Sequence, residues 1–294
     1  MGMYKGPPIT EIWTGKGTFL ELTSLEGPHQ PIPDKLMEVV QSFVKVLPST
    51  AALILNSHRE AEKYHIAEIE RRAGTEVICC GPLVPALSLK EKNGEGDNLI
   101  QWLNTQKPAS VIYIGFGSLV TPEPEQLKEI AKALMTLKKP FIWSLKPAFH
   151  QYLPEDLLMT EGSLGKVCSW VPQQEVLMNA SVGLALHHGG WGATQQTLIA
   201  GKPALVWPMA SDERMAGKYL VEKKAALMME GTGIIAERLV LAEEIAQALD
   251  EVQMTCQKSA EMWGQKLRQA LLEGGTSQKE LEQLLHIINE RCSF

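Results

Sequence analysis

Short apolar runs alternate with amphipathic segments along the chain from about residue 98 onward. The runs are continuously or nearly continuously apolar, which is typical of strands buried on both faces of a parallel sheet. They lie at 111–116, 141–145, 166–169, 183–187 and 204–207. Between the first two, Leu127, Ile130, Ala131, Leu134 and Leu137 recur at helical spacing. This spacing predicts the crossover helix of a β-α-β unit, and right-handed crossovers predict a doubly wound α/β layer.

The pattern is less regular before residue 98. Residues 1–50 read as irregular apart from one amphipathic segment, made of Leu36, Val39, Val40, Phe43 and Val44. Apolar runs at 51–55 and 76–80 predict buried strands on either side of a polar helix. The prolines of 81–85 and the lysine-rich tract to Asn98 indicate a linker.

The end of the chain carries the signature of a final helix. Ser277 is followed three residues later by Glu280, a capping-box pattern that predicts a helix start at Ser277. One face of this helix is apolar and requires a surface to cover; it carries Leu281, Leu284, Leu285 and Ile288.

Composition and charge narrow the class of protein. The 294 residues are 45% hydrophobic, enough for one large domain or two small ones. A net charge of -6 without clustered Lys and Arg argues against nucleic acid as a partner. Five scattered cysteines without C-x-x-C spacing suggest free thiols in a reducing compartment, and hence a cytoplasmic protein. The sequence predicts no signal peptide, membrane span or metal site.

Candidate binding chemistry lies in the loops that follow the predicted strands, where doubly wound sheets bind ligands. G-F-G-S at 115–118 lets the backbone approach an anion and offers the Ser118 hydroxyl, although alone it reads better as a tight turn. H-H-G-G-W-G-A-T at 187–194 predicts a helix start behind glycines, which suits a phosphate. P-M-A-S-D-E at 208–213 offers acidic acceptors for sugar hydroxyls or caps for the next helix.

The stretch from Trp170 to Glu213 closely resembles, without a gap, the signature box of the plant-type family 1 UDP-sugar-dependent glycosyltransferases. Segments 99–118 and 273–277 resemble the family as well, so that the resemblance covers roughly residues 50–290. It implies a GT-B architecture, in which two Rossmann-like domains face a cleft and the second holds the UDP-sugar. It also implies inverting transfer without a metal, with no cofactor beyond the UDP-sugar co-substrate.

Most of the family's donor-binding roles can be carried over to matching residues. Trp170 matches the tryptophan that stacks on uracil, for which a flat indole is suited. Gln173 matches a glutamine near the uridine. His188 matches the histidine that contacts the diphosphate, and Gly190 and Trp191 match the phosphate turn. Alone, the tryptophan would read as a core aromatic and the histidine as a structural residue.

The sugar end of the box agrees less completely. Asp212 matches the aspartate that binds hydroxyls of the transferred sugar. Gly192 and Ala193 replace the family's asparagine and serine, so that two side-chain donors are lost. Gln196 stands in place of a glutamate that bridges the ribose hydroxyls, and Glu213 in place of a glutamine. UDP-glucose is the expected donor, and these substitutions could weaken its binding or alter the sugar.

The family's general base is a histidine near the start of its first domain, and we find no counterpart among the seven histidines. About 150 residues of an acceptor domain are therefore expected to be missing. The sequence predicts a partial acceptor-domain remnant (1–85), a linker (86–98), a donor-binding domain (99–276) and a crossover helix (277–294).

Two functional classes follow from this reading. The first is a glycosyltransferase that moves a sugar, expected to be glucose, onto a hydroxyl of a small lipophilic acceptor of secondary metabolism, with the base supplied by an N-terminal half from elsewhere. The second is a truncated, non-catalytic UDP-sugar-binding or interaction module. A Rossmann oxidoreductase is disfavoured, because G-F-G-S lacks the full dinucleotide glycine pattern. Exposed apolar strands of a partial domain would also favour self-association.

Overall fold

A computed structural model describes most of the chain, which divides into two compact units. The described residues are 11–13, 19–21, 38, 42, 45–83, 95–118, 120–158, 164–209, 213–232 and 238–291. The first unit contains residues 1–83 and 269–294, and the second contains residues 84–268. Each unit has its own sheet and its own buried cluster, so that each is considered by itself.

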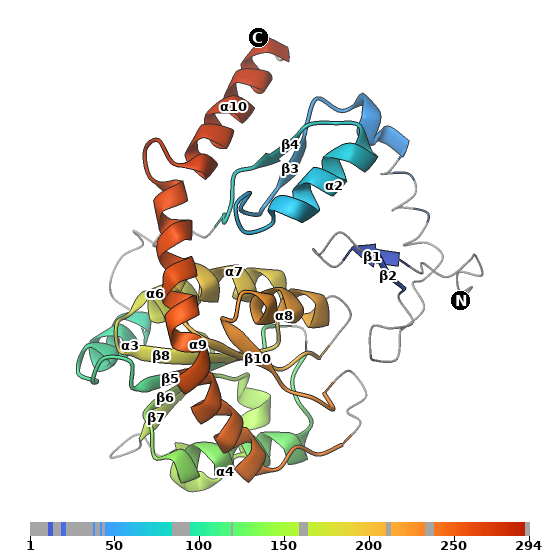
Figure 1. The fold of residues 1–294 in the computed structure, drawn as a ribbon. Helices are drawn as coiled ribbons and strands as arrows, with labels where there is room; N and C mark the ends of the chain where they lie inside the picture. The colour runs from blue at the N-terminus through green and yellow to red at the C-terminus, as the bar shows by residue number, and fades with distance from the viewer. Residues whose placement is uncertain are drawn as a thin grey trace. The chain divides into compact units, whose positions relative to one another are not determined.

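A six-stranded parallel sheet forms the centre of the second unit (Figure 1). Its order is β10-β9-β8-β5-β6-β7. The strands are β5 (Val111–Gly115), β6 (Phe141–Ser144), β7 (Gly165–Cys168), β8 (Val182–His187), β9 (Ala204–Val206) and β10 (Ala226–Met228). The chain leaves β5 towards β6 and β7, then returns to the other side of β5 and continues to β10. The predicted doubly wound α/β fold is confirmed.

Helices cover both faces of this sheet (Figure 1). One face carries α3 (Glu95–Asn104), α6 (Gln173–Met178), α7 (Trp191–Ala200) and α8 (Glu213–Glu222). The other carries α4 (Pro124–Leu137), the 3₁₀ segment η3 (Pro147–Tyr152), α5 (Glu155–Leu158) and α9 (Ala242–Leu271). Because both faces are covered, most strand residues are apolar and buried, as the sequence pattern predicted, while the edge strand β7 contains Lys166 and is partly exposed.

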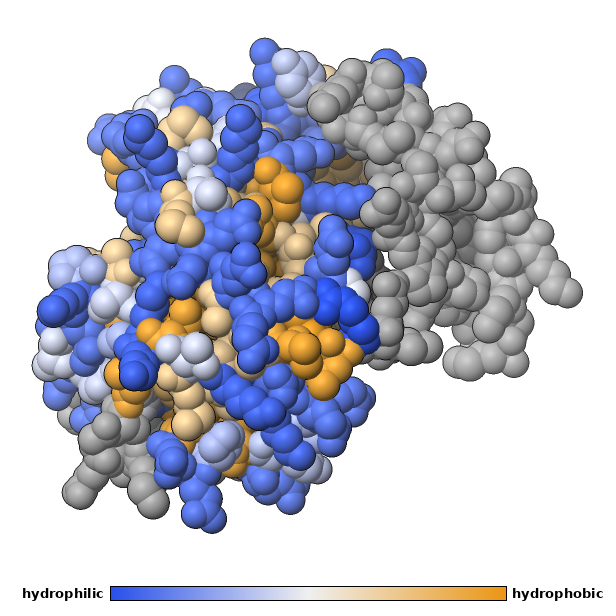
Figure 2. Space-filling model, turned by 60° about the horizontal axis from the view of Figure 1, so that its bottom comes forward, coloured by the Kyte–Doolittle hydropathy of each residue, from blue (hydrophilic) through white to orange (hydrophobic). Residues whose placement is uncertain are grey.

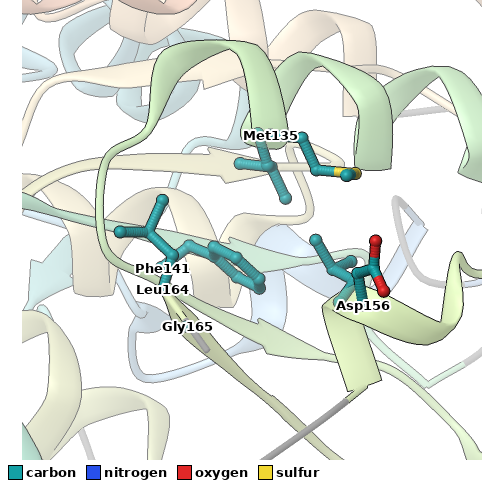
Figure 3. Close-up of a pocket in the computed structure, with 7 residues that line it drawn as sticks. Met135, Phe141, Asp156, Leu164 and Gly165 are labelled. Atoms are coloured by element: carbon teal, nitrogen blue, oxygen red, sulfur yellow. The ribbon is translucent and has the colours of Figure 1, made fainter. Parts of the chain in front are cut away.

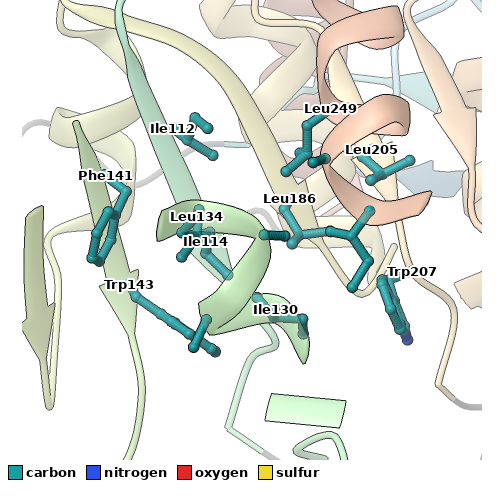
Figure 4. Packing of buried hydrophobic residues seen from close by; sticks show 14 of the residues in the cluster. Ile112, Ile114, Ile130, Leu134, Phe141, Trp143, Leu186, Leu205, Trp207 and Leu249 are labelled. Carbon is teal, nitrogen blue, oxygen red and sulfur yellow. The ribbon is translucent and has the colours of Figure 1, made fainter. Parts of the chain in front are cut away.

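The larger buried cluster lies between the sheet and the helices α4 and α9 (Figure 4). Ile112, Ile114 and Leu186 alternate along β5 and β8 and meet Ile130 and Leu134 of α4. The predicted crossover helix is therefore present, and it begins with Pro124, whose fixed φ suits the first turn of a helix. A second cluster packs the opposite face of the sheet against α3 and α6. The two clusters fix the carboxyl ends of the strands in space.

The first unit is built around two parallel strands, β3 (Leu53–Leu55) and β4 (Val77–Cys79), joined by α2 (Lys63–Ala73). This strand-helix-strand unit is the one predicted for residues 51–80, but only β4 is buried as expected, because Ile54 of β3 is 49% exposed. The unit also contains η2 (Leu47–Ser49) and α10 (Thr276–Arg291), which packs against β4. Burial raises the pKa of the Cys79 thiol in β4 to about 12.

One arginine ties the elements of the first unit together. The Arg59 Nε donates to Glu280 Oε1 of α10 at 2.6 Å, and Nη1 donates to Glu70 Oε1 of α2 at 3.1 Å. The Arg59 Nη2 also donates to the Val77 carbonyl of β4, and the Cys79 N–H donates to Glu280 Oε2. These bonds, led by the one to Glu280, raise the pKa of the guanidinium above its ordinary value. Arg59 and Glu280 thus join α2, β4 and α10.

The capping box predicted at Ser277 is wrong. Helix α10 already begins at Thr276, and the Ser277 hydroxyl donates to the Gly81 carbonyl at 2.6 Å. The Glu280 carboxylate is bound by Arg59 and the Cys79 N–H instead of its own helix terminus. Tertiary partners have taken both side chains that the capping box requires.

Other differences concern short elements. The sequence did not predict the short strand β10, nor the antiparallel pair β1 (Glu11–Trp13) and β2 (Phe19–Glu21) in the segment expected to be irregular. Residues 95–98, placed in the linker by sequence, form the first turn of α3. The apolar positions of the amphipathic segment 36–44 lie outside the described residues, as does most of the linker.

The described surface is predominantly polar on the face drawn in Figure 2, where apolar side chains form small patches between charged ones. Along α10, Leu281, Leu285 and Ile288 are partly exposed. Within the described residues, no helix combines the length and apolar character needed to cross a membrane.

Candidate functional site: the switch point of the sheet

The order of the strands changes direction between β5 and β8. These neighbours are parallel, and Gly115 at the end of β5 pairs with His187 at the end of β8. The connection after β5 leads to one side of the sheet and the connection after β8 leads to the other. The loops that follow the two strands therefore diverge, which is the topological switch point where doubly wound sheets bind ligands.

The loop after β8 leads directly into a helix N-terminus. Gly189 has a φ of 94°, in the left-handed region that favours glycine, and Gly190 is the N-cap of α7. No side chain caps this helix, and its first bond runs from the Thr194 N–H to the Gly190 carbonyl. A Cβ on Gly192 would meet no atom within 4 Å. Among the described residues, the first turn of α7 therefore has no side-chain cap and has room beside Gly192, which suits an anion site.

His188 is held tightly in this turn. A Cβ on Gly117 would lie 2.9 Å from its Cε1, and a Cβ on Gly190 would lie 2.4 Å from its Nε2. The imidazole is thus packed between the loop after β5 and the start of α7. Its Nε2 lies 3.9 Å from Glu213 Oε1, and its Nδ1 has no hydrogen-bond partner among the described residues. The ring is closely packed, and its buried Nδ1 keeps unused hydrogen-bonding capacity.

His187, which the sequence did not suggest as a site residue, supports the turn. The Nδ1 of His187 accepts a hydrogen bond from the Gly189 N–H at 3.1 Å. Burial, reinforced by the neighbouring His188, lowers the pKa of His187 to about 3, so that the ring is neutral and Nδ1 can accept. The signal available in the sequence was its position as the last residue of a buried strand, directly before three turn residues.

Two glutamines form the adjacent part of the site. Gln173 is the first residue of α6, and Gln196 lies in α7. The Gln173 Nε2 donates to Gln196 Oε1 at 2.6 Å, and Gln173 Oε1 accepts from the Tyr113 hydroxyl at 2.7 Å. The structure therefore joins two residues that the sequence predicted as parts of one site, and adds Tyr113, which the sequence did not suggest.

The other predicted donor-binding residues lie on several different elements. Trp170 follows β7 and is 69% exposed. Ser118 lies in the exposed turn after β5, where its carbonyl accepts from Lys146 Nζ at 2.6 Å. Neither side chain is hydrogen-bonded to the other site residues within the described part of the chain. Trp191 begins α7, where its ring packs edge-on against Tyr219 of α8 at a centroid distance of 5.3 Å.

Three predicted residues belong to the sugar end. Ala193 is nearly buried in the first turn of α7. Glu213 is buried at the start of α8, where its Oε2 accepts from the Met209 N–H at 2.7 Å. Asp212 lies outside the described residues. At the sugar end, the described carboxylate is therefore that of Glu213, which lies beside His188.

A separate pocket lies at the other side of the sheet, between α4, α5 and the strands β6 and β7 (Figure 3). Its lining is mainly apolar, with Asp156 as the charged side chain. None of the predicted donor-binding residues lines it. The helix N-terminus and the glycine-rich turn that suit an anion lie at the switch point, so we place the candidate site there.

A doubly wound sheet with a glycine-rich turn and a helix N-terminus at its switch point defines a nucleotide-binding domain of Rossmann type. Residues 83–259 match the family model described as UDP-glucoronosyl and UDP-glucosyl transferase. The chain belongs to this family. Solved structures of similar fold are plant glycosyltransferases of the GT-B type, so the predicted fold class and family are both confirmed.

Comparison with individual relatives shows how much of each known protein the chain covers. An anthocyanidin 3-O-glucosyltransferase of Manihot esculenta is 29% identical over 266 residues, which are 87% of this chain and 89% of that protein. An anthocyanidin 3-O-galactosyltransferase of Rhododendron delavayi is 33% identical over 210 residues, 69% of this chain and 46% of that protein. A transferase from Siraitia grosvenorii in complex with UDP superposes with a TM-score of 0.76 at 25% identity, covering 86% of this chain and 63% of that chain. The chain therefore spans less than two thirds of the last two.

Proposed function

We propose that the chain is the donor-binding part of an inverting, metal-independent UDP-glycosyltransferase. It transfers a sugar, with glucose as the expected donor sugar, to a hydroxyl of a small lipophilic acceptor. The observation that supports this most strongly is the α7 N-terminus at the switch point, with His188 held between Gly117 and Gly190. An anion at this position meets both a helix dipole and an imidazole.

The order of the loops supports an extended donor. Trp170 follows β7 at one edge of the sheet, His188 follows β8 near its middle, and Glu213 lies beyond β9. In this proposal uracil stacks on Trp170, Gln173 and Gln196 contact the nucleoside, and the diphosphate lies on the turn formed by Gly190, Trp191, Gly192 and Ala193 with Ser118 nearby. Asp212 and Glu213 contact the transferred sugar.

The proposed chemistry follows from where charge develops. The acceptor hydroxyl attacks the anomeric carbon from the face opposite to UDP, and the bond to the diphosphate breaks with inversion. Negative charge accumulates on the leaving diphosphate, where the α7 N-terminus and His188 can stabilise it. A positioned base accepts the hydroxyl proton. In this proposal residues 99–276 form the donor domain, while 1–85 and 277–294 belong to the acceptor side.

A second candidate, a UDP-sugar-binding module without turnover, is favoured by the state of several described histidines. His58 and His187 are buried, and burial lowers the pKa of both. His150 Nε2 is bonded to the Leu145 carbonyl, and His286 lies 3.3 Å from Glu290. His58 and His187 are therefore not placed as solvent-accessible bases, whereas the His286 side chain is 70% exposed on α10. Such a module would act by binding, through self-association or together with an N-terminal half.

The cellular setting is also a proposal. Cys79, Cys80 and Cys256 are thiols rather than disulfides, which suits a reducing compartment such as the cytoplasm.

Mass-spectrometric measurement of UDP-sugar consumption separates the two candidates. The glycosyltransferase proposal expects consumption in the presence of a flavonoid acceptor when the chain is co-expressed with the N-terminal half of a relative. The binding-module proposal expects saturable UDP binding without consumption under either condition. Absence of both binding and consumption would reject the two candidates together.

A further inference from the structure

A chain of hydrogen bonds runs from the core of the second unit to the candidate nucleotide site. It joins Tyr113 of β5 to Gln173 of α6, at 2.7 Å, and Gln173 to Gln196 of α7, at 2.6 Å. Tyr113 is only 2% exposed, whereas both glutamines are partly exposed. The tyrosine is therefore positioned to influence the rim of the site without contacting a ligand.

The buried Tyr113 hydroxyl determines which groups donate and which accept in both hydrogen bonds. Burial raises the pKa of the Tyr113 phenol above its ordinary value, so that the hydroxyl keeps its proton and donates to Gln173 Oε1. The amide group of Gln173 then presents its NH₂ to Gln196, whose Oε1 accepts. Because each amide has one carbonyl and one NH₂, Gln196 is left with its NH₂ as the group directed away from Gln173.

A glycine makes this arrangement possible. Tyr113 and Gly115 are two residues apart on β5, so that their side-chain directions coincide. A Cβ on Gly115 would lie 2.5 Å from the Tyr113 hydroxyl oxygen. The absence of a side chain at Gly115 therefore leaves the space that the phenol occupies on the face covered by α6.

We propose that Tyr113 is a positioning residue of the nucleotide site: acting through Gln173, it fixes Gln196 with the amide NH₂ turned towards the ligand. The nucleoside is then met by a neutral hydrogen-bond donor. This inference rests on the proposed function, because it takes Gln173 and Gln196 as parts of the nucleoside-binding region. It adds a residue in the core that contributes to affinity only through the two glutamines.

The first test uses the free protein and requires no ligand. The full chain is labelled with ¹⁵N in its glutamine side-chain amides, and the signals are assigned with Gln173→Ala and Gln196→Ala. Tyr113→Phe should shift the amide signals of both glutamines, whereas Tyr152→Phe in η3 should shift neither. A Gln196 signal that does not respond to Tyr113→Phe would overturn the relay.

The second test measures UDP affinity by calorimetry in a double-mutant cycle. Tyr113→Phe should weaken UDP binding about fivefold, the usual effect of one lost hydrogen bond, but less than about twofold in the Gln196→Ala background. Gly115→Ala, which displaces the same hydroxyl, should also weaken binding and shift both amide signals. Equal losses from Tyr113→Phe in the two backgrounds would mean a merely structural tyrosine and would overturn the proposal.

The outcome also separates this inference from the proposed function. If wild type binds UDP but the effects of Tyr113→Phe and Gln196→Ala on affinity are additive, only the positioning role of Tyr113 is contradicted. A folded wild-type chain that fails to bind UDP contradicts the nucleotide-sugar assignment, and with it the role given to Tyr113. Thermal unfolding of each variant establishes that it is folded before either conclusion is drawn.

Discussion

Gly117 lies directly against the ring of His188, such that a Cβ on the glycine would stand 2.9 Å from the imidazole Cε1. The two residues follow neighbouring strands, β5 and β8, whose connections diverge at the switch point. The loop of one strand therefore holds the side chain supplied by the other. Gly117 also has a φ of 75°, so that both its conformation and its contact favour glycine.

Replacing Gly117 by alanine should displace His188 and weaken UDP binding. We expect about a tenfold rise in Kd, since steric displacement and backbone strain each cost about 1 kcal/mol or more. Calorimetry with UDP measures the effect. Gly274→Ala is the matched control, because Gly274 has a similar φ of 76° but no atom within 4 Å of the added Cβ. Equal UDP affinity of Gly117→Ala and wild type would contradict the role of His188.

Trp170→Ala should reduce UDP affinity without reducing stability. Stacking of a base on an aromatic side chain contributes about 1–3 kcal/mol, so we expect at least about a fivefold rise in Kd. The melting temperature should remain unchanged, because the side chain is 69% exposed. Trp170→Phe should retain most of the affinity. If both variants bind UDP as tightly as wild type, the uracil does not stack on Trp170.

His187 should make the free energy of unfolding depend on pH. Its pKa is lowered to about 3 in the folded chain, against about 6.5 when unfolded. Between these values the unfolded chain binds the proton and the folded chain does not. Stability is therefore lost as the pH falls below about 6.5, by up to about 1.4 kcal/mol per pH unit.

Urea unfolding at pH 7 and pH 5 tests this dependence. His187→Gln removes the titrating group, so the variant should lose less stability than wild type between the two values. Other groups titrate equally in both proteins, and the difference between them isolates His187. Identical losses would show that the ring is protonated in the folded chain.

Arg59→Ala should loosen the first unit. It removes three hydrogen bonds to carboxylates and leaves Glu280, which is 12% exposed, with the Cys79 N–H. We expect a loss of about 1–2 kcal/mol, less than for a fully buried pair, because a third of the Arg59 side chain meets water.

Hydrogen exchange of β4 and α10 reports this loss directly. Arg71→Ala is the control, since Arg71 pairs with Glu68 on the exposed surface of α2. Exchange in β4 and α10 should accelerate only in Arg59→Ala. Unchanged protection in that variant would show that apolar packing alone holds α10 in place.

Periodicity and glycine positions predicted five of the six strands in the sheet of the second unit. Strands buried on both faces are apolar runs, and the helix start predicted behind the glycines of 187–194 is the start of α7, because these features act locally. The strand β10 was missed although the equally short β9 was predicted, because its apolar run A-A-L-M-M at 225–229 lacks β-branched residues and consists of good helix formers. Hydrogen bonds between distant segments could not be predicted from the sequence either. Examples are the bond from the Ser277 hydroxyl to the Gly81 carbonyl and the bond from the Tyr113 hydroxyl to Gln173. Such bonds depend on the assembled fold rather than on neighbouring residues.

The sequence also predicted part of the candidate site. The turn at His188 and Gly190 is local and carries a sequence pattern, whereas the neutral His187 and the space left by Gly115 arise from burial and close approach in the sheet. The sugar-binding role of Asp212 and Glu213 stays a prediction.

Titration of the 294-residue chain with UDP in a calorimeter tests the central claim most directly. A saturable site with a Kd below about 1 mM, or about -4 kcal/mol, is expected, with uridine at least about tenfold weaker because it lacks the diphosphate that we propose α7 and His188 to bind. No saturable heat with UDP at millimolar concentration, or equal affinity for uridine and UDP, would contradict a diphosphate site at the switch point.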